Sequence, residues 1–118
     1  MRAFKLLILS SLVLLQVTAL AAIKPISCKT NFGERSFTIE GSTVAFHKDK
    51  DGRSISSVMN SKTLASYTGF KKTIYKDGSR HLINIKDTAN FNSDNDFLAI
   101  TTSKGHKMTF PINCQAAL

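Results

Sequence analysis

The end of the chain constrains its fold most, because residues 97–114 predict two strands joined by a tight turn. Residues 97–102 form a mostly apolar run, and the polar segment 103–106 interrupts it. In the arm that follows, apolar residues stand at every second position: Met108, Phe110, Ile112 and Cys114. A period of two is that of a strand with one buried face. We therefore expect a β-hairpin that closes a small β domain.

The two cysteines predict a covalent link between the ends of that domain. Cys114 lies in the last arm, and Cys28 lies near the start of the expected mature chain. In an oxidising compartment, a lone pair of cysteines usually forms a disulfide. Closing so long a loop would stabilise the fold by about 4–5 kcal/mol in the chain-entropy model. A reactive thiol or metal pair is the alternative, but the chain has no Cys-x-x-Cys motif to support it.

The first 21 residues have the three-part pattern of a secretory signal peptide. Arg2 and Lys5 precede an uncharged, leucine-rich segment that ends in small residues around Ala19 and Ala21. This pattern predicts cleavage after Ala21, export to the periplasm or the exterior, and one β domain over residues 22–118. An uncleaved membrane anchor is the alternative, although Ser10, Ser11 and Gln16 dilute the apolar run.

The chain is strongly basic. It has 16 Lys and Arg against 8 Asp and Glu, a formal net charge of +8. Such a charge favours contact with anionic components of the cell envelope. The basic residues are scattered, and Lys71–Lys72 is the only adjacent pair. Scattered cations are typical of a solvated surface, so nucleic acid is not the partner that we expect.

Two Asp-Gly dipeptides predict further hairpins, because Asp and Gly tolerate the positive φ angles of a type I′ turn. A two-residue turn at Asp51–Gly52 would pair Phe46 with Ser57. It would also place Ile55 and Met59 on the face of Val44 and Phe46. The same turn at Asp77–Gly78 would pair Ile74 with His81 and Phe70 with Ile85, with these apolar residues and Ile83 on one side.

Together the runs predict an all-β domain. We count seven or eight short strands joined by short links, which indicates an antiparallel meander. The chain is expected to bend at Gly69. A flattened barrel is the first architecture that we expect and a two-sheet sandwich the second, with the disulfide joining the first and last strands.

No motif in the chain assembles a catalytic or metal site. Asp49 and Asp51 fit turn chemistry better than a calcium loop, and the Asn92, Asp94 and Asp96 alternation lacks the glycine and glutamate that would complete one. The three histidines, His47, His81 and His106, share no metal-ligand spacing. We therefore expect no enzyme activity and no cofactor, although a zinc site or a small hydrolase built from separate strands is not detectable from spacing.

Two groups of residues are candidates for binding a partner. Lys71 and Tyr75 would share the outward face of one strand if Phe70 and Ile74 are core, and such a face suits an anionic polymer or is simply solvated. Ser103, Lys104 and His106 would occupy the turn of the last hairpin. An exported protein or an anionic envelope component is the expected partner.

The framework resembles the periplasmic inhibitors of c-type lysozymes. The likeness rests on the signal peptide, the cysteine in the first strand, the cysteine in the last strand, and the Ser103-Lys104-Gly105 loop before a strand that ends at Cys114. In that family a Ser-Lys-Gly loop enters the lysozyme cleft, so the resemblance implies that Ser103 and Lys104 insert. The family's upstream Ser-Gly-x-x-Tyr element is absent, and residues 66–69 hold only a rearranged version of it.

Overall fold

A computed structural model describes residues 24–33, 35–48 and 54–117 as a fold built from β-strands. Its strands are β1 (Ile26–Thr30), β2 (Ser36–Glu40), β3 (Thr43–His47), β4 (Ile55–Asn60), β5 (Lys62–Ala65), β6 (Phe70–Lys76), β7 (Ser79–Ile85), β8 (Phe97–Thr101) and β9 (Lys107–Ala116). The expected signal peptide and the Asp51–Gly52 turn lie outside the described residues. Among those described, no helix is long and apolar enough to span a bilayer.

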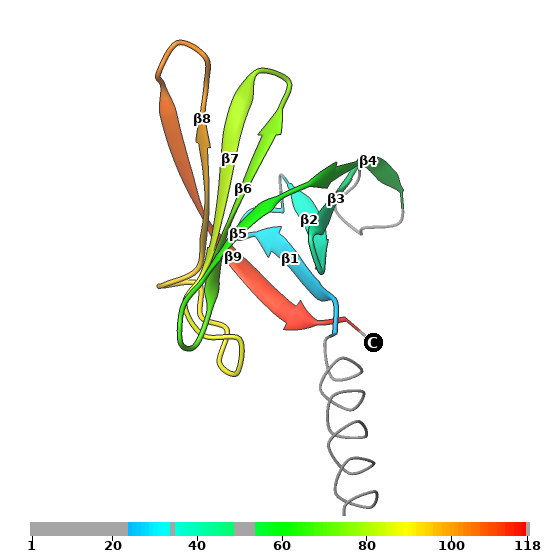
Figure 1. The fold of residues 1–118 in the computed structure, drawn as a ribbon, viewed down its shortest axis with the longest axis vertical. Helices are drawn as coiled ribbons and strands as arrows, with labels where there is room; N and C mark the ends of the chain where they lie inside the picture. The colour runs from blue at the N-terminus through cyan, green and yellow to red at the C-terminus, as the bar shows by residue number, and fades with distance from the viewer. Residues whose placement is uncertain (1–23, 34, 49–53, 118) are drawn as a thin grey trace, which may run out of the picture.

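The strands form one antiparallel sheet in the order β4-β3-β2-β1-β9-β8-β7-β6-β5. Its two edge strands, β4 and β5, follow each other directly in the chain, so the sheet curls into a nearly closed barrel (Figure 1). The predicted all-β meander is therefore confirmed. Nine strands replace the seven or eight expected, because the chain changes partner at Ser61: β4 pairs with β3, and β5 pairs with β6.

The hairpin registers follow the predicted turn chemistry closely. Asp77 and Gly78 have φ angles of 54° and 76°, and Ile74 pairs with His81 and Phe70 with Ile85. Phe46 pairs with Ser57 as predicted. One detail was wrong. The register shifts after Phe46, so Ile55 lies opposite His47 and is 58% exposed rather than part of the core.

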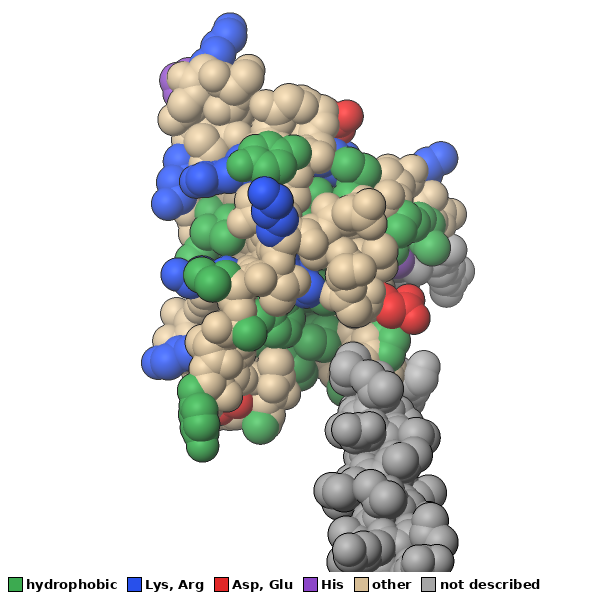
Figure 2. Space-filling view, viewed as in Figure 1, with side chains coloured by type: hydrophobic (Ala, Val, Ile, Leu, Met, Phe, Trp, Pro, Cys, Tyr) green, Lys and Arg blue, Asp and Glu red, His purple; other side chains and the backbone are tan. Residues whose placement is uncertain are grey.

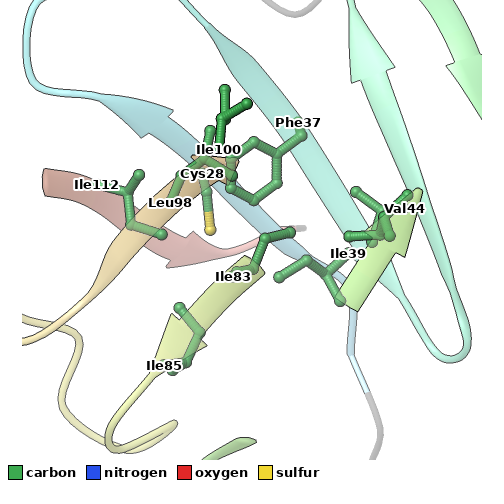
Figure 3. Packing of buried hydrophobic residues seen from close by; sticks show 10 residues of the cluster. Cys28, Phe37, Ile39, Val44, Ile83, Ile85, Leu98, Ile100 and Ile112 are labelled. Atoms are coloured by element: carbon green, nitrogen blue, oxygen red, sulfur yellow. The ribbon is translucent and has the colours of Figure 1, made fainter. Parts of the chain in front are cut away.

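Cys28 and Cys114 lie directly opposite each other on β1 and β9 and form the predicted disulfide. The bond crosses the pair of strands that contain the two ends of the domain. Beside it, buried side chains from seven strands converge inside the curled sheet (Figure 3). The core comprises Cys28, Phe37, Ile39, Val44, Ile74, Ile83, Ile85, Leu98, Ile100 and Ile112.

Lys72 is a charged residue within this interior. It is 4% exposed, and its Nζ donates hydrogen bonds to Gly41 O at 2.8 Å and to Thr63 Oγ1 at 2.6 Å. Gly41 lies in the β2–β3 turn and Thr63 on β5, two parts of the sheet that are not paired by a ladder. Lys72 therefore links two parts of the sheet at the place where the barrel closes. Burial lowers the pKa of its ammonium group.

The long segment between β7 and β8 is organised by Asp96, which is 1% exposed. Its carboxylate accepts hydrogen bonds from the backbone N–H of Lys86, at 3.0 Å, and of Asn92, at 2.9 Å. Asp96 was one of the three residues considered for calcium from the sequence. Both of its carboxylate oxygens accept hydrogen bonds from backbone N–H groups. Within the described ranges, no group of three His, Cys, Asp or Glu side chains could hold a metal ion.

Candidate partner-binding surfaces

The tip of the β8–β9 hairpin is an exposed, internally hydrogen-bonded turn. Thr102 N donates to His106 O and Gly105 N donates to Thr102 O, both at 2.9 Å. His106 N also donates to Thr102 Oγ1 at 3.2 Å. Gly105 has a φ of 87°, which a glycine adopts without strain. Ser103, Lys104 and His106 are all exposed, and the hairpin projects beyond the body of the sheet (Figure 1).

The outward face of β6 has the orientation predicted for it. Lys71 is exposed and Tyr75 is 67% exposed, while the alternate residues Lys72 and Ile74 point inward and are buried. On β7, Asn84 lies opposite Lys71, and Arg80 lies opposite Tyr75.

Outward cations continue along the neighbouring strands without acidic counterparts. Strands β5 to β9 contain no Asp or Glu, and their outward basic residues are Lys62, Lys71, Arg80 and Lys107. Figure 2 shows several of the blue side chains along the side of the molecule that these strands form, where red is sparse. The face is therefore electropositive over its strands, although the cations are separated rather than clustered.

A third group lies inside the sheet and was not recognised from the sequence. It comprises Phe46, Ser57, Lys76 and His81, and we call it the Phe46 cluster. The His81 ring stands edge-on to the Phe46 ring, with 5.7 Å between centroids. Lys76 Nζ lies over the same ring, 5.4 Å from its centroid. Ser57 is the cross-strand neighbour of Phe46 and so faces the same way.

Two buried polar atoms of the Phe46 cluster have no hydrogen-bond partner: Ser57 Oγ and His81 Nδ1. His81 is 6% exposed. Burial is the main cause that lowers its pKa, and the positive charges of Lys76 and Arg35 add to it. A hydrogen bond with the Ser79 backbone and the charge of Asp77 oppose the shift. The largest of these effects, burial, favours the uncharged form of the His81 ring.

Two pockets lie near the opposite end of the barrel and share Phe70. One, of about 450 Å³, is lined mainly by apolar side chains, among them Ile26, Phe91 and Ala116. The other, of about 350 Å³, is lined by Leu64, Lys71, Lys86 and neighbouring residues of β5 to β7. Neither of these two pockets is lined by a histidine or a carboxylate, so neither brings together a proton donor and acceptor of the kind that hydrolysis uses.

The structure separates most of the candidate residues that the sequence named. His106 and Lys104 lie at the hairpin tip, Lys71 and Tyr75 on the outer face, and His81 inside the sheet. His47 bonds to Thr38, with 2.9 Å between His47 Nε2 and Thr38 Oγ1. The Phe46 cluster was missed because its members come from two predicted hairpins, and only the curl of the sheet brings those hairpins together. Comparison of the chain with protein-family models, with curated proteins and with solved structures finds no match.

Proposed function

We propose that this chain is an exported, non-enzymatic binding module that engages a protein partner with the tip of its β8–β9 hairpin. The observation that carries the proposal is the geometry of that tip. Three hydrogen bonds fix its backbone, and its side chains are free to make contacts. A pre-ordered loop loses little entropy on binding, which is the usual basis of tight inhibitory contacts.

The chemistry of the tip favours a concave, acidic surface as its target. Lys104 lies in the turn at the end of the projecting β8–β9 hairpin, between Ser103 and His106, and all three residues are exposed. Glycosidases hold a pair of carboxylates in such a cleft. Together with the resemblance to periplasmic lysozyme inhibitors, this favours a lysozyme-like cell-wall hydrolase as the partner. Because the chain is basic, an acidic or neutral hydrolase is a better partner than a strongly basic one.

The test is inhibition of a panel of lysozymes of differing net charge by the oxidised protein. We expect inhibition of at least one at micromolar concentration or below. Lys104→Glu should weaken it by about tenfold or more, because a carboxylate would then face the carboxylates of the cleft.

Lys29→Glu is the matched control. Lys29 is exposed on β1 and undergoes the same change of charge, so this variant separates contact at the tip from an effect of net charge. Equal losses from the two variants, or no inhibition of any enzyme in the panel, would reject the hairpin tip as the binding element.

Attachment to an anionic envelope surface is a second candidate function, favoured by the outward cations of β5 to β9. Binding to vesicles that contain an anionic phospholipid should then weaken steeply with salt and with Arg80→Glu. Binding that neither change affects would exclude it.

A further inference from the structure

The closure of the barrel leaves unpaired strand edges that can receive another backbone. β4 has a hydrogen-bonded neighbour on one side only, β3, because it is an end strand of the sheet. β5 stops pairing with β6 at Lys62 and Thr73, so Ile74, Tyr75 and Lys76 pair only with β7. β4 and the upper part of β6 thus diverge above Ser61, and Figure 1 shows the two strands separating there. We call the line along which the barrel closes, from the level of Lys72 up to that of Lys76 on β6, the β4–β6 seam, and its upper half is this opening.

Lys72 and Lys76 show that the seam is bridged differently in its two halves. Both point inward from β6. In the lower half, Lys72 ties β6 to Thr63 and to the β2–β3 turn by hydrogen bonds. In the upper half, the Lys76 ammonium lies over the Phe46 ring and donates to Asp77 in the adjoining turn, but it has no hydrogen bond across the seam among the described residues. The upper half of the seam therefore lacks a backbone ladder and, among described residues, a side-chain hydrogen bond that would replace one.

The Phe46 cluster borders this upper half from both sides. Ser57 belongs to β4, and Lys76 and His81 belong to β6 and β7. Buried polar atoms are almost always hydrogen-bonded, and a buried group without a partner costs stability. Ser57 Oγ and His81 Nδ1 both lack a hydrogen-bond partner. Ser57 lies opposite Phe46 across the β3–β4 pair, and the His81 ring stands edge-on to the Phe46 ring. Unsatisfied groups beside an unpaired strand edge point to a ligand that brings hydrogen-bonding groups with it.

The charge of the cluster indicates what that ligand carries. Among the residues that the structure describes, Lys76 has one carboxylate within bonding distance, that of its neighbour Asp77, which is 85% exposed. The charges of Lys76 and Arg35 act to lower the pKa of His81, and of the acids that the structure describes only Asp77 acts to raise it. The positive charges of Lys76 and Arg35 would repel a cationic group of the ligand and attract a carboxylate. A second copy of this basic chain is disfavoured on the same ground.

We propose that the β4–β6 seam binds an extended, carboxylate-bearing peptide segment of a partner protein, which adds to the sheet as a strand beside β4. The backbone of the peptide pairs with the free edge of Ile55–Asn60. Its inward side chains meet Phe46, and one carboxylate reaches Lys76. Strand addition of this kind obtains affinity from the backbone and specificity from alternate side chains. The site is distinct from the hairpin tip, and the proposal does not rest on the function assigned to that tip.

The probe is the acetylated, amidated heptapeptide Thr-Val-Thr-Glu-Thr-Val-Thr, which presents Val, Glu and Val on one face of a strand. Two relatives serve as controls: one with Gln in place of Glu, and one in which every backbone nitrogen between the two terminal caps is methylated. With the full, oxidised chain, we expect the parent peptide to bind about tenfold more tightly than the Gln peptide, because a charge-assisted hydrogen bond is lost. The methylated peptide should not bind measurably, because it cannot form the ladder.

Hydrogen exchange locates the contact, and variants test its chemistry. Amides of β4 should gain protection in the presence of the parent peptide. Lys76→Gln should weaken the parent peptide about tenfold and leave the Gln peptide unchanged, while Lys71→Gln, on the outer face of the same strand, changes neither. Lys104→Glu should leave peptide binding intact, which keeps this test separate from that of the hairpin tip.

Several results would overturn the proposal. They are no binding at millimolar peptide, protection that spares β4, equal binding of the methylated peptide, or equal binding of acetate alone, which would indicate an anion site. Sedimentation that shows a dimer whose formation already protects β4 would assign the seam to a second copy instead. Thermal unfolding of Lys76→Gln verifies that this variant is folded, and the unchanged Gln-peptide affinity confirms that its seam is intact.

Discussion

Lys72 is the residue on which the closure of the barrel depends most directly. Strand alternation turns Lys71 to solvent and Lys72 to the interior, so two adjacent lysines have opposite surroundings. The Lys72 ammonium also lies 5.3 Å from the centroid of the Phe70 ring. Its charge is poorly solvated, which costs stability. Its hydrogen bonds and its buried methylene stem act in the other direction.

Replacing Lys72 by Ala tests which effect dominates. The buried stem contributes about 0.8 kcal/mol per methylene, and its hydrogen bonds to Gly41 and Thr63 add to that. The substitution also removes the poorly solvated charge of Lys72, which offsets part of this loss of stability. We expect Lys72→Ala to lower the free energy of unfolding by about 2–3 kcal/mol, measured by urea denaturation. Lys71→Ala should change it by about 0.5 kcal/mol or less, as exposed sites do. Equal midpoints for the two variants would contradict a bridging role.

Individual strands and tight turns could be predicted from this sequence, and their changes of partner could not. The Asp77–Gly78 turn was predicted with its register, because the φ angles of those two residues are a local property. The break at Ser61 is different. Residues on either side of it continue the same extended chain, and only the closing of the sheet decides that Asn60 pairs with Thr43 while Lys62 pairs with Thr73. The Phe46 cluster was missed for the same reason.

The turn that leads from β5 to β6 provides a prediction for these elements. A Cβ on Gly69 would overlap the carbonyl oxygen of Ile85, a backbone atom that cannot move aside easily. Gly69 also accepts a hydrogen bond from Ser66 N at 2.9 Å. Gly69→Ala should therefore lower the free energy of unfolding by about 1–3 kcal/mol, the usual cost of overpacking.

Gly105→Ala is the contrasting variant, because a Cβ there meets nothing within 4 Å and only the positive φ opposes it. Its expected cost is about 1 kcal/mol. Thermal and urea unfolding of the two variants measure the difference. A Gly69 variant as stable as the parent protein would show that the backbone at Gly69 does not approach the end of β7 tightly.

At the scale of the whole molecule, the disulfide acts where the sheet is already continuous. Cys28 and Cys114 are cross-strand neighbours within five residue pairs of β1 and β9. The native ladder holds these strands together without the bond, so the disulfide chiefly restricts the unfolded chain by closing a loop with a sequence separation of 86. By restricting the unfolded chain, the disulfide stabilises the folded sheet, which contains both the hairpin tip and the β4–β6 seam.

Replacing both cysteines by Ala should leave the folded sheet unchanged and lower its free energy of unfolding by about 4–5 kcal/mol. The total free energy of unfolding of a native domain is about 5–15 kcal/mol, so the variant should be marginally stable at 37 °C. Urea unfolding with and without reductant measures the effect. The parent protein should shift to the midpoint of the double variant when reduced, and the double variant should not respond. If reduction leaves the parent's midpoint unchanged, the ladder between β1 and β9 alone restricts the chain ends, and the crosslink contributes little to the closure of the barrel.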